Sequence, residues 1–448
     1  MPPRRRRFRR LALGLIALLV VVVIAGYWYE RPLLLTGTGY AAHNACALHH
    51  LAGRADAESD LPPNPLVPSL RAKDIDAGAA VQASLLGLLA RQRAWHTEGL
   101  GCTLAGDRPE LEPGGPLAAT GNPFTGAAAP AADPTLAAAL GHAFGDDLVT
   151  AEQARLGTRA VVVVRDGKIV AERYAAGFTA TTRQLGWSMA KSAANLLLGT
   201  LVLQGAVEVD DANLLPLWRD ERSAITIEQL ARMTSGLTWD ETYALGTPVT
   251  RMLYREPDMG GYAASLDLAH APGTYQQYSS GSTNILCKVL HERTRVGPDL
   301  PRRQLFEPLG LSSAVWEPDA SGATVCSSYL WATPRDWAAI GQFALQGGEW
   351  RGKRLLPQDW MTWSTTHTDV RSEEANYAAG WWVNRLADGT LLEQGLPEDT
   401  YWAQGHDGQR LYVVPSERLV VVRLGFTPEL ESDQLRTVQL VEDVIAAG

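Results

Sequence analysis

The sequence predicts an α+β fold, an α/β sandwich whose antiparallel sheet is built from both ends of the main body and carries helices on both faces. Residues 158–175 and 410–425, at opposite ends of that body, each have the pattern of a β-hairpin. The chain between them has the pattern of helices and loops, which indicates a helical insertion. An uncharged stretch near the N-terminus predicts a transmembrane helix ahead of this body.

Residues 1–30 predict a membrane anchor. From Leu11 to Tyr29 the chain carries no charge, six arginines precede this stretch, and a Tyr-Trp-Tyr sequence closes it. About 20 apolar residues span a bilayer, aromatic residues mark its interface, and arginines stay on the cytoplasmic side. We therefore expect a single-pass protein of the inner membrane with its catalytic part on the periplasmic side. A cleaved signal peptide with a site at Val23-Ile24-Ala25 is the alternative, and it would also export the chain.

Composition and charge exclude several classes of protein. The 448 residues are 46% apolar and have a net charge of −9, which excludes collagen and a chain disordered over its whole length. Without the six arginines of the first ten residues, the net charge becomes −15. Because an anionic surface repels phosphate groups, we expect no nucleic acid partner.

The four cysteines fit an exported protein. Cys46 and Cys102 lie in a predicted N-terminal extension, residues 31–140, and Cys287 and Cys326 lie in the main body, residues 141–448. Three pairings are possible. Proximity favours Cys46–Cys102, with the other two either paired or left as buried thiols. Since neither the cysteines nor the histidines have metal-ligand spacing, we predict no metal and no cofactor.

The extension is expected to be mainly helical from residue 31 to 104. Residues 79–89 are a predicted helix, with Val81, Leu85, Leu88 and Leu89 on one face. Residues 105–134 are rich in Pro, Gly and Ala, which predicts a long ordered arm or linker.

The two hairpins of the main body have clear turn signals. Asp166-Gly167 separates two runs rich in β-branched residues in TRAVVVVRDGKIVAERYA. The second hairpin, RLYVVPSERLVVVRLG, is expected to turn around residues 415–418. A final helix is predicted after it, with Leu435, Val438, Val441 and Ile445 on one face.

Residues 186–205, GWSMAKSAANLLLGTLVLQG, predict a buried helix that places a serine beside a lysine. Ser188 falls at its start, and Lys191 follows three residues later, so the amine stacks over the hydroxyl. The helix N-terminus adds partial positive charge and free N–H groups. This arrangement suits a serine nucleophile with a nearby base and backbone donors for an oxyanion.

The identity of the basic residue strengthens this interpretation. The chain has 40 basic residues, of which five are lysines, and only Lys191 has a serine three residues before it. A desolvated lysine can act as a base, whereas arginine stays protonated in proteins. The alternative, a capping serine followed by a lysine that reaches solvent, requires a polar face that this helix lacks.

Two later segments complete a known pattern. PGTYQQYSSGSTNILCKVL contains Tyr278 and Ser280 before an apolar helix, and YWAQGHDGQRLYVVP contains His406 and Gly408. Ser-x-x-Lys, Tyr-x-Ser and His-x-Gly follow one another in the order of the penicillin-recognising serine hydrolases. From about residue 140 onward the chain resembles this β-lactamase-like family. The resemblance is greatest to the branch with class C β-lactamases, esterases and aminohexanoate-oligomer hydrolases, and residues 230–241 and 331–343 resemble its connecting segments.

The resemblance implies roles for these residues. Ser188 would be the nucleophile, and Lys191 and Tyr278 would form a coupled proton-transfer pair. The backbone N–H groups of Ser188 and Gln409 would form the oxyanion hole, and Gly408 would leave room for the acyl group. The implied activity is that of an exported, membrane-anchored serine hydrolase that forms an acyl-enzyme on a small ester or linear amide.

Departures from the family pattern argue against efficient β-lactam turnover. His406 stands where β-lactamases and D,D-peptidases usually have lysine, and Ser280 stands where they have asparagine. A mostly neutral histidine holds a ligand carboxylate less well, and a serine lacks the amide that binds the substrate's amide. Arg410 could bind a substrate carboxylate, although a plain exposed arginine is the simpler expectation.

Tryptophans flank the motifs, and Trp239 is the candidate wall of an apolar acyl site; the others are Trp187, Trp331, Trp381, Trp382 and Trp402. Core packing is the alternative explanation for most of them.

Three other functions stay open: a D,D-peptidase or β-lactamase, an α/β-hydrolase with a triad of Ser188, an aspartate and His406, and an idle binding or scaffold protein. Ala190 in place of the last glycine of the nucleophile elbow, and the poor strand before Ser188, argue against the triad.

Overall fold

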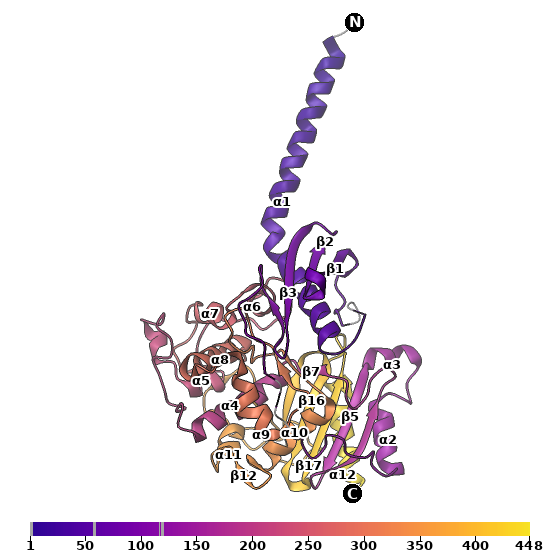
Figure 1. Ribbon diagram of the computed structural model, residues 1–448, viewed down its shortest axis with the longest axis vertical. Coiled ribbons are helices and arrows are strands. Elements are labelled where there is room, and N and C mark those ends of the chain that lie inside the picture. Colours follow the sequence, from indigo (N-terminus) through magenta and orange to yellow (C-terminus); the bar gives the residue numbers. More distant parts are fainter. Residues whose placement is uncertain (1–2, 57–59, 116, 118–120) are drawn as a thin grey trace.

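The computed structural model describes residues 3–56, 60–115, 117 and 121–448. Its first element, α1 (Pro3–His50), is a single helix that projects from the body of the protein, as Figure 1 shows. Apolar side chains in its first half are exposed, among them Leu15 (72%) and Val23 (62%). In the described part of the chain, this is the one helix that is long and apolar enough to cross a membrane.

The second half of α1 is packed into the N-terminal extension. Ala42, Cys46 and Leu48 are buried. They face a four-stranded antiparallel sheet of β1 (Leu70–Ile75), β2 (Ala80–Leu85), β3 (Leu89–Thr97) and β4 (Gly101–Leu104). The predicted helix over residues 79–89 is therefore wrong. Leu86 and Gly87 form a tight turn with positive φ between β2 and β3, and Leu88, expected on the buried face, is 70% exposed.

The main sheet has the predicted composition. Its strand order is β14-β15-β16-β17-β5-β6, so its strands come from both ends of the main body and all neighbours are antiparallel. The strands are β5 (Thr158–Arg165), β6 (Lys168–Tyr174), β14 (Trp382–Val383), β15 (Tyr401–Gly405), β16 (Gln409–Val414) and β17 (Leu419–Gly425). Both predicted hairpins are confirmed, and Asp166 and Gly167 adopt the positive φ values of a tight hairpin turn.

Helices cover both faces of this sheet, which confirms the α+β class. Val162 and Val164 of β5 belong to the core shared with α4 (Met189–Leu203) and α10 (Pro334–Leu345). Val161 and Val163 face the other way, into the core shared with α2 (Pro134–Ala143) and α12 (Thr437–Ala446). In α12 the fully buried apolar residues are Leu440, Val441 and Val444; of the predicted face, Val441 is among them, and Val438 and Ile445 are partly buried against the same core.

Shorter elements make up the rest of the body. The helices are α3 (Thr150–Leu156), α5 (Ile227–Ala231), α6 (Pro248–Arg255), α7 (Met259–Ala264), α8 (Ser280–Thr294), α9 (Glu307–Leu309) and α11 (Trp360–Thr365). The strands are β7 (Gln184–Leu185), β8 (Tyr275–Gln276), β9 (Val315–Trp316), β10 (Leu330–Ala332), β11 (Glu349–Trp350), β12 (Lys353–Arg354) and β13 (Arg371–Ser372).

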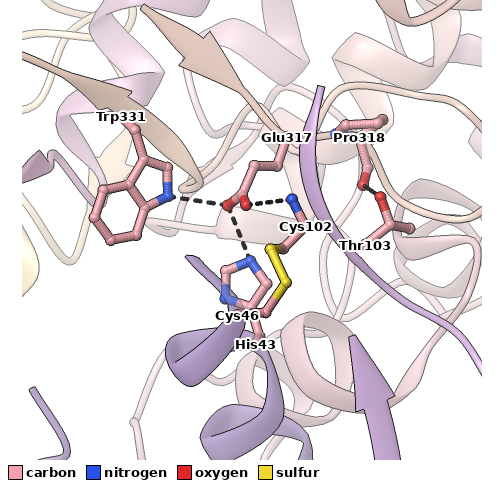
Figure 2. Close-up of a disulfide and its surroundings, with 7 residues drawn as sticks. All are labelled: His43, Cys46, Cys102, Thr103, Glu317, Pro318 and Trp331. Atoms are coloured by element: carbon pink, nitrogen blue, oxygen red, sulfur yellow. Dashed lines mark hydrogen bonds and ion pairs between the residues drawn. A yellow bond between two sulfur atoms is a disulfide. The ribbon is translucent and has the colours of Figure 1, made fainter. Parts of the chain in front are cut away.

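A buried carboxylate joins the extension to the body. Glu317, fully buried just after β9, accepts hydrogen bonds from His43 Nε2 of α1 (2.9 Å), the Cys102 backbone N–H (2.7 Å) and Trp331 Nε1 (3.0 Å). Figure 2 shows these groups beside the Cys46–Cys102 disulfide, which confirms the pairing that proximity favoured. Because a buried carboxylate needs several donors, this junction fixes the extension against the body.

Candidate active site

Ser188 lies where a strained backbone enters a buried helix. Trp187, just before it, has a φ of 49°, in the left-handed region that a bulky residue rarely adopts. Ser188 itself is the residue that precedes the first turn of α4. Gly186 supports this turn, because a side chain there would collide with the ring of Trp337. Backbone strain of this kind is typical of functional sites.

Lys191 is buried and points directly at Ser188. Its Nζ donates to Ser188 Oγ (2.7 Å), Ser280 Oγ (2.9 Å) and the Ser327 carbonyl oxygen (3.1 Å), and the residue is 3% exposed. Burial lowers the pKa of Lys191 to about 8, against the smaller opposing effect of the Glu241 carboxylate. A substantial fraction of the amine is therefore neutral near physiological pH.

Tyr278 completes the group. The Lys191 Nζ lies 4.8 Å from the centre of the Tyr278 ring. Burial raises the pKa of Tyr278 well above its usual value, and a hydrogen bond with the Ser188 side chain opposes the rise only in part. The phenol thus holds its proton at neutral pH. The structure brings the three predicted catalytic side chains, from two distant segments, around one point.

Glu241 belongs to the same network, although the sequence interpretation did not include it. Its carboxylate accepts from Ser280 Oγ (2.5 Å), the Ser280 backbone N–H (2.8 Å) and Trp239 Nε1 (2.6 Å). It therefore orients Ser280, which in turn contacts Lys191. Glu241 lies in a connecting segment 53 residues after Ser188, so no local spacing points to it.

The second disulfide supports Lys191 from the other side. Cys287 of α8 is bonded to Cys326, the residue before Ser327. The Ser327 N–H also donates to Asn284 Oδ1 (3.0 Å) on α8. These two links fix the Ser327 carbonyl oxygen that accepts from Lys191.

A cavity of about 380 Å³ opens over the nucleophile. Ser188 and Tyr278 line it together with the 405–408 turn, and carboxylates of Glu241, Glu374 and Glu431 line its walls. Among the described residues that line it, none is a lysine. The cavity has room for a small substrate and carries excess negative charge.

Residues of the His-x-Gly segment line this cavity. His406 lines it, with its side chain 33% exposed, and stacks on Tyr243 with ring centres 4.2 Å apart. Gly408 also lines it, but a side chain there would meet Arg423, and its φ is 86°. The turn and the contact with Arg423 therefore explain why residue 408 is a glycine. The sequence interpretation gave a different reason, room for the acyl group of the substrate.

Gln409 does not line the cavity of Ser188. Its buried side chain donates to the Gly425 carbonyl (2.7 Å) and accepts from the Gly425 N–H (3.0 Å). Gly405, at the end of β15, instead lies against the segment before Ser188, since a side chain there would overlap the Gly186 carbonyl. His406 follows Gly405 directly, so residues 405–406 bring their backbone beside the start of α4.

Two other predicted contacts also lie elsewhere, and a third, Arg410, is in the cavity wall but buried. Ser280 is fully buried behind Lys191, and Trp239 is 6% exposed with its ring against Gly281; neither lines the cavity. Arg410, expected to be exposed, is 4% exposed and donates to Ser432 Oγ (2.7 Å) at the cavity wall. Of the flanking tryptophans, Trp382 lines the cavity, and the rest are packed in the core or in other walls.

Comparison with known proteins agrees with this architecture. Residues 145–441 match the protein family described as Beta-lactamase. A curated relative is the 6-aminohexanoate-dimer hydrolase of Paenarthrobacter ureafaciens, 23% identical over 301 residues, which cover 61% of this chain and 73% of the relative.

Two solved structures have the same fold at low identity. A penicillin-binding protein homologue from Caulobacter crescentus superposes with a TM-score of 0.53 at 17% identity, over 72% of this chain and 99% of that one. A family VIII carboxylesterase gives 0.54 at 15% identity, over 72% and 99%.

Proposed function

This chain belongs to the Beta-lactamase family of serine hydrolases, and from that premise we propose that it hydrolyses a small ester or linear amide through an acyl-enzyme on Ser188. The observation that carries the proposal is the 2.7 Å hydrogen bond between Lys191 Nζ and Ser188 Oγ, with Tyr278 on the same serine. By their names, two of the proteins compared above hydrolyse the 6-aminohexanoate dimer, a linear amide, and carboxylic esters.

Lys191 is the proposed base. As an amine it can accept the Ser188 proton while it still donates to Ser280 and to the Ser327 carbonyl. The Ser188 oxygen then attacks the substrate carbonyl carbon. Tyr278, a phenol at neutral pH, gives its proton to the leaving oxygen or nitrogen, and the Lys191 ammonium restores it. Water, activated by the same pair, then releases the acid and frees Ser188.

The oxyanion donors are proposed to be the backbone N–H groups of Ser188 and His406. The Ser188 N–H lies at the start of α4, where the helix dipole favours negative charge. For the second donor we prefer His406 over Gln409, because His406 lines the cavity and follows Gly405 beside Gly186.

β-Lactams and D,D-peptides are disfavoured as substrates. Their carboxylate needs a cation beside the scissile bond, whereas this cavity is lined by three glutamates and by His406, whose side chain is one-third exposed. Arg410, the one arginine in the lining, is buried and bound to Ser432. The penicillin-binding relative is the reason to keep these substrates in the test.

We propose that α1 anchors the protein in the inner membrane and that residues 141–448 form a catalytic domain on the periplasmic side. The exposed apolar half of α1 and the two disulfides support this placement, because disulfides persist in oxidising compartments. An uncleaved anchor is favoured over a cleaved leader, since α1 continues without a break into its buried second half.

A hydrolysis panel on the full chain in detergent tests the proposal. The substrates are p-nitrophenyl acetate and butyrate, the linear 6-aminohexanoate dimer, nitrocefin and a D-Ala-D-Ala peptide. We expect turnover of the esters or the linear amide and slow turnover of nitrocefin. Labelling by a fluorophosphonate should be lost in Ser188→Ala. Fast nitrocefin turnover, or a serine that no probe labels, would contradict the proposal.

A further inference from the structure

A second cavity, of about 240 Å³, lies beside the cavity of Ser188 and differs from it in character. Among the residues that the structure describes, no Asp, Glu, Lys or Arg lines it, and its walls are mainly aliphatic, aromatic and proline residues. They come from α1 (Gly37 and Tyr40), from the segment 61–70 and from the body (Leu245 and Tyr254). The N-terminal extension therefore builds most of this pocket.

The two cavities meet at one wall. Tyr243, His406 and Pro428 line both of them. The rings of Tyr243 and His406 stack within 12° of parallel, and the His406 side chain is one-third exposed. A molecule bound at Ser188 thus has an apolar compartment directly behind this pair.

The contrast in lining determines where an alkyl chain would go. In the Ser188 cavity it would displace water from Glu241, Glu374 and Glu431, which is unfavourable for carboxylates. In the second pocket it would displace water mainly from apolar surface and from no described charged side chain other than the His406 ring. The volume is sufficient, since an apolar cavity of about 150 Å³ already binds benzene.

We propose that this pocket binds a linear alkyl chain of the substrate's acyl group, so that the preferred substrates are amphiphilic esters or amides of medium chain length. The inference rests on the proposed hydrolysis at Ser188. Its position supports an acyl source in the bilayer: Gly37 follows Tyr29, the last residue of the uncharged stretch, by eight residues. Eight helical residues measure about 12 Å along α1, which places Gly37 just beyond a lipid headgroup layer of roughly 5–8 Å.

Gly37→Leu is the variant that fills the pocket. A side chain at Gly37 meets only Leu66 and Leu245, at 3.5 Å or more, and replacing a mid-helix glycine favours the helix. Gly26→Leu is the matched control, because Gly26 lies in the same helix with nothing within 4 Å. Both variants and the native chain are assayed in one detergent with p-nitrophenyl acetate, butyrate, octanoate and decanoate.

The measured quantity is the ratio of kcat/KM for octanoate to that for acetate. Each buried methylene is worth about four-fold, so two of them already give a preference of more than about ten-fold. We expect such a ratio in the native chain and in Gly26→Leu, and a ratio near one in Gly37→Leu. A flat chain-length profile in the native chain, or equal ratios in all three proteins, would overturn the inference while leaving hydrolysis at Ser188 intact.

A binding measurement separates the two proposals. In a Ser188→Ala background, decanoate should bind at least ten-fold more weakly when Gly37→Leu is added, and equally well when Gly26→Leu is added. If no ester or amide is hydrolysed but this difference remains, the proposed function fails and the alkyl pocket stands. If decanoate binds all three proteins alike, the pocket assignment fails.

Discussion

The two cavities that meet at Tyr243 and His406 come from different parts of the chain. The body alone supplies the lining of the Ser188 cavity, which carries three glutamates. The extension supplies more than half of the neighbouring pocket, in whose lining the structure describes no Asp, Glu, Lys or Arg. In the proposed mechanism, bond cleavage therefore belongs to one region and contact with the rest of the substrate to another.

This difference has a physical basis. The proposed chemistry needs an amine near neutrality and a protonated phenol, and burial among fixed polar partners produces both. Apolar binding needs only surface without charge, which can vary without disturbing those partners. Changes on the two sides of the Tyr243–His406 wall should therefore have separable effects.

Lys191→Ala should give the largest effect. Loss of the base should lower kcat/KM by between about 10²- and 10⁴-fold, equally for acetate and octanoate esters, because both react at Ser188. Steady-state kinetics on the two esters measure this. Lys168→Ala, an exposed lysine of the β5–β6 turn, is the control. Full activity in Lys191→Ala would favour the triad of Ser188 and His406 instead.

The second-largest expected effect is the pH dependence of kcat/KM in the native chain. Because the neutral amine of Lys191 is the active form and its pKa is about 8, kcat/KM should rise about ten-fold per pH unit below 8 and level off above it. The profile should have the same midpoint for short and long acyl chains. An activity that falls as the pH rises from 6 to 8 would exclude the neutral amine as the base.

Glu241→Gln should reduce activity by roughly ten-fold, the size expected when hydrogen bonds to a charged group worth about 1.5 kcal/mol are weakened. It should also move the rising limb of the profile to lower pH, because the carboxylate favours the ammonium form of Lys191. Glu398→Gln, at an exposed ion pair with Arg385, should change neither. If the rate falls but the midpoint of the pH profile does not change, Glu241 does not act on the pKa of Lys191 and only supports the packing of the site.

Glu317→Gln should have the smallest effect on turnover and a clear effect on stability. The three donors around Glu317 bind its two carboxylate oxygens, whereas a glutamine side chain offers them only one acceptor oxygen. The free energy of unfolding should therefore fall by about 1–3 kcal/mol. Urea denaturation followed by tryptophan fluorescence measures it. The octanoate-to-acetate ratio should fall a few-fold, as the extension that walls the pocket loosens. An unchanged unfolding curve would show that the junction contributes little.

Local patterns predicted the parts of the molecule that local geometry determines. Asp166-Gly167 defines its hairpin alone, and the three-residue spacing of Ser188 and Lys191 places them together on any helix. Glu241 could not be found in this way, because its contact with Ser280 depends on how two distant loops pack.

The extension was predicted less well for a related reason. In residues 80–85, Val81, Ala83 and Leu85 alternate with Ala80, Gln82 and Ser84, as in a strand. Val81, Leu85, Leu88 and Leu89 also have helical spacing, so the short segment fits both patterns until its packing against α1 is known. Arg410 was expected at the surface, yet Ser432 from beyond β17 covers it. In both cases the deciding partner is remote in the sequence.

Glu317 has a consequence for how an exported chain of this kind must assemble. It meets His43 and Cys102 across sequence separations of 274 and 215 residues. In the proposed export, the extension crosses the membrane before Glu317 does, so the donors of the extension stay unmatched until about two-thirds of the polypeptide has been translocated. Oxidation of Cys46 with Cys102 needs only the early part of the chain and could keep those donors together during the delay. In that case the Cys46–Cys102 disulfide first holds the extension together while the rest of the chain is still being translocated.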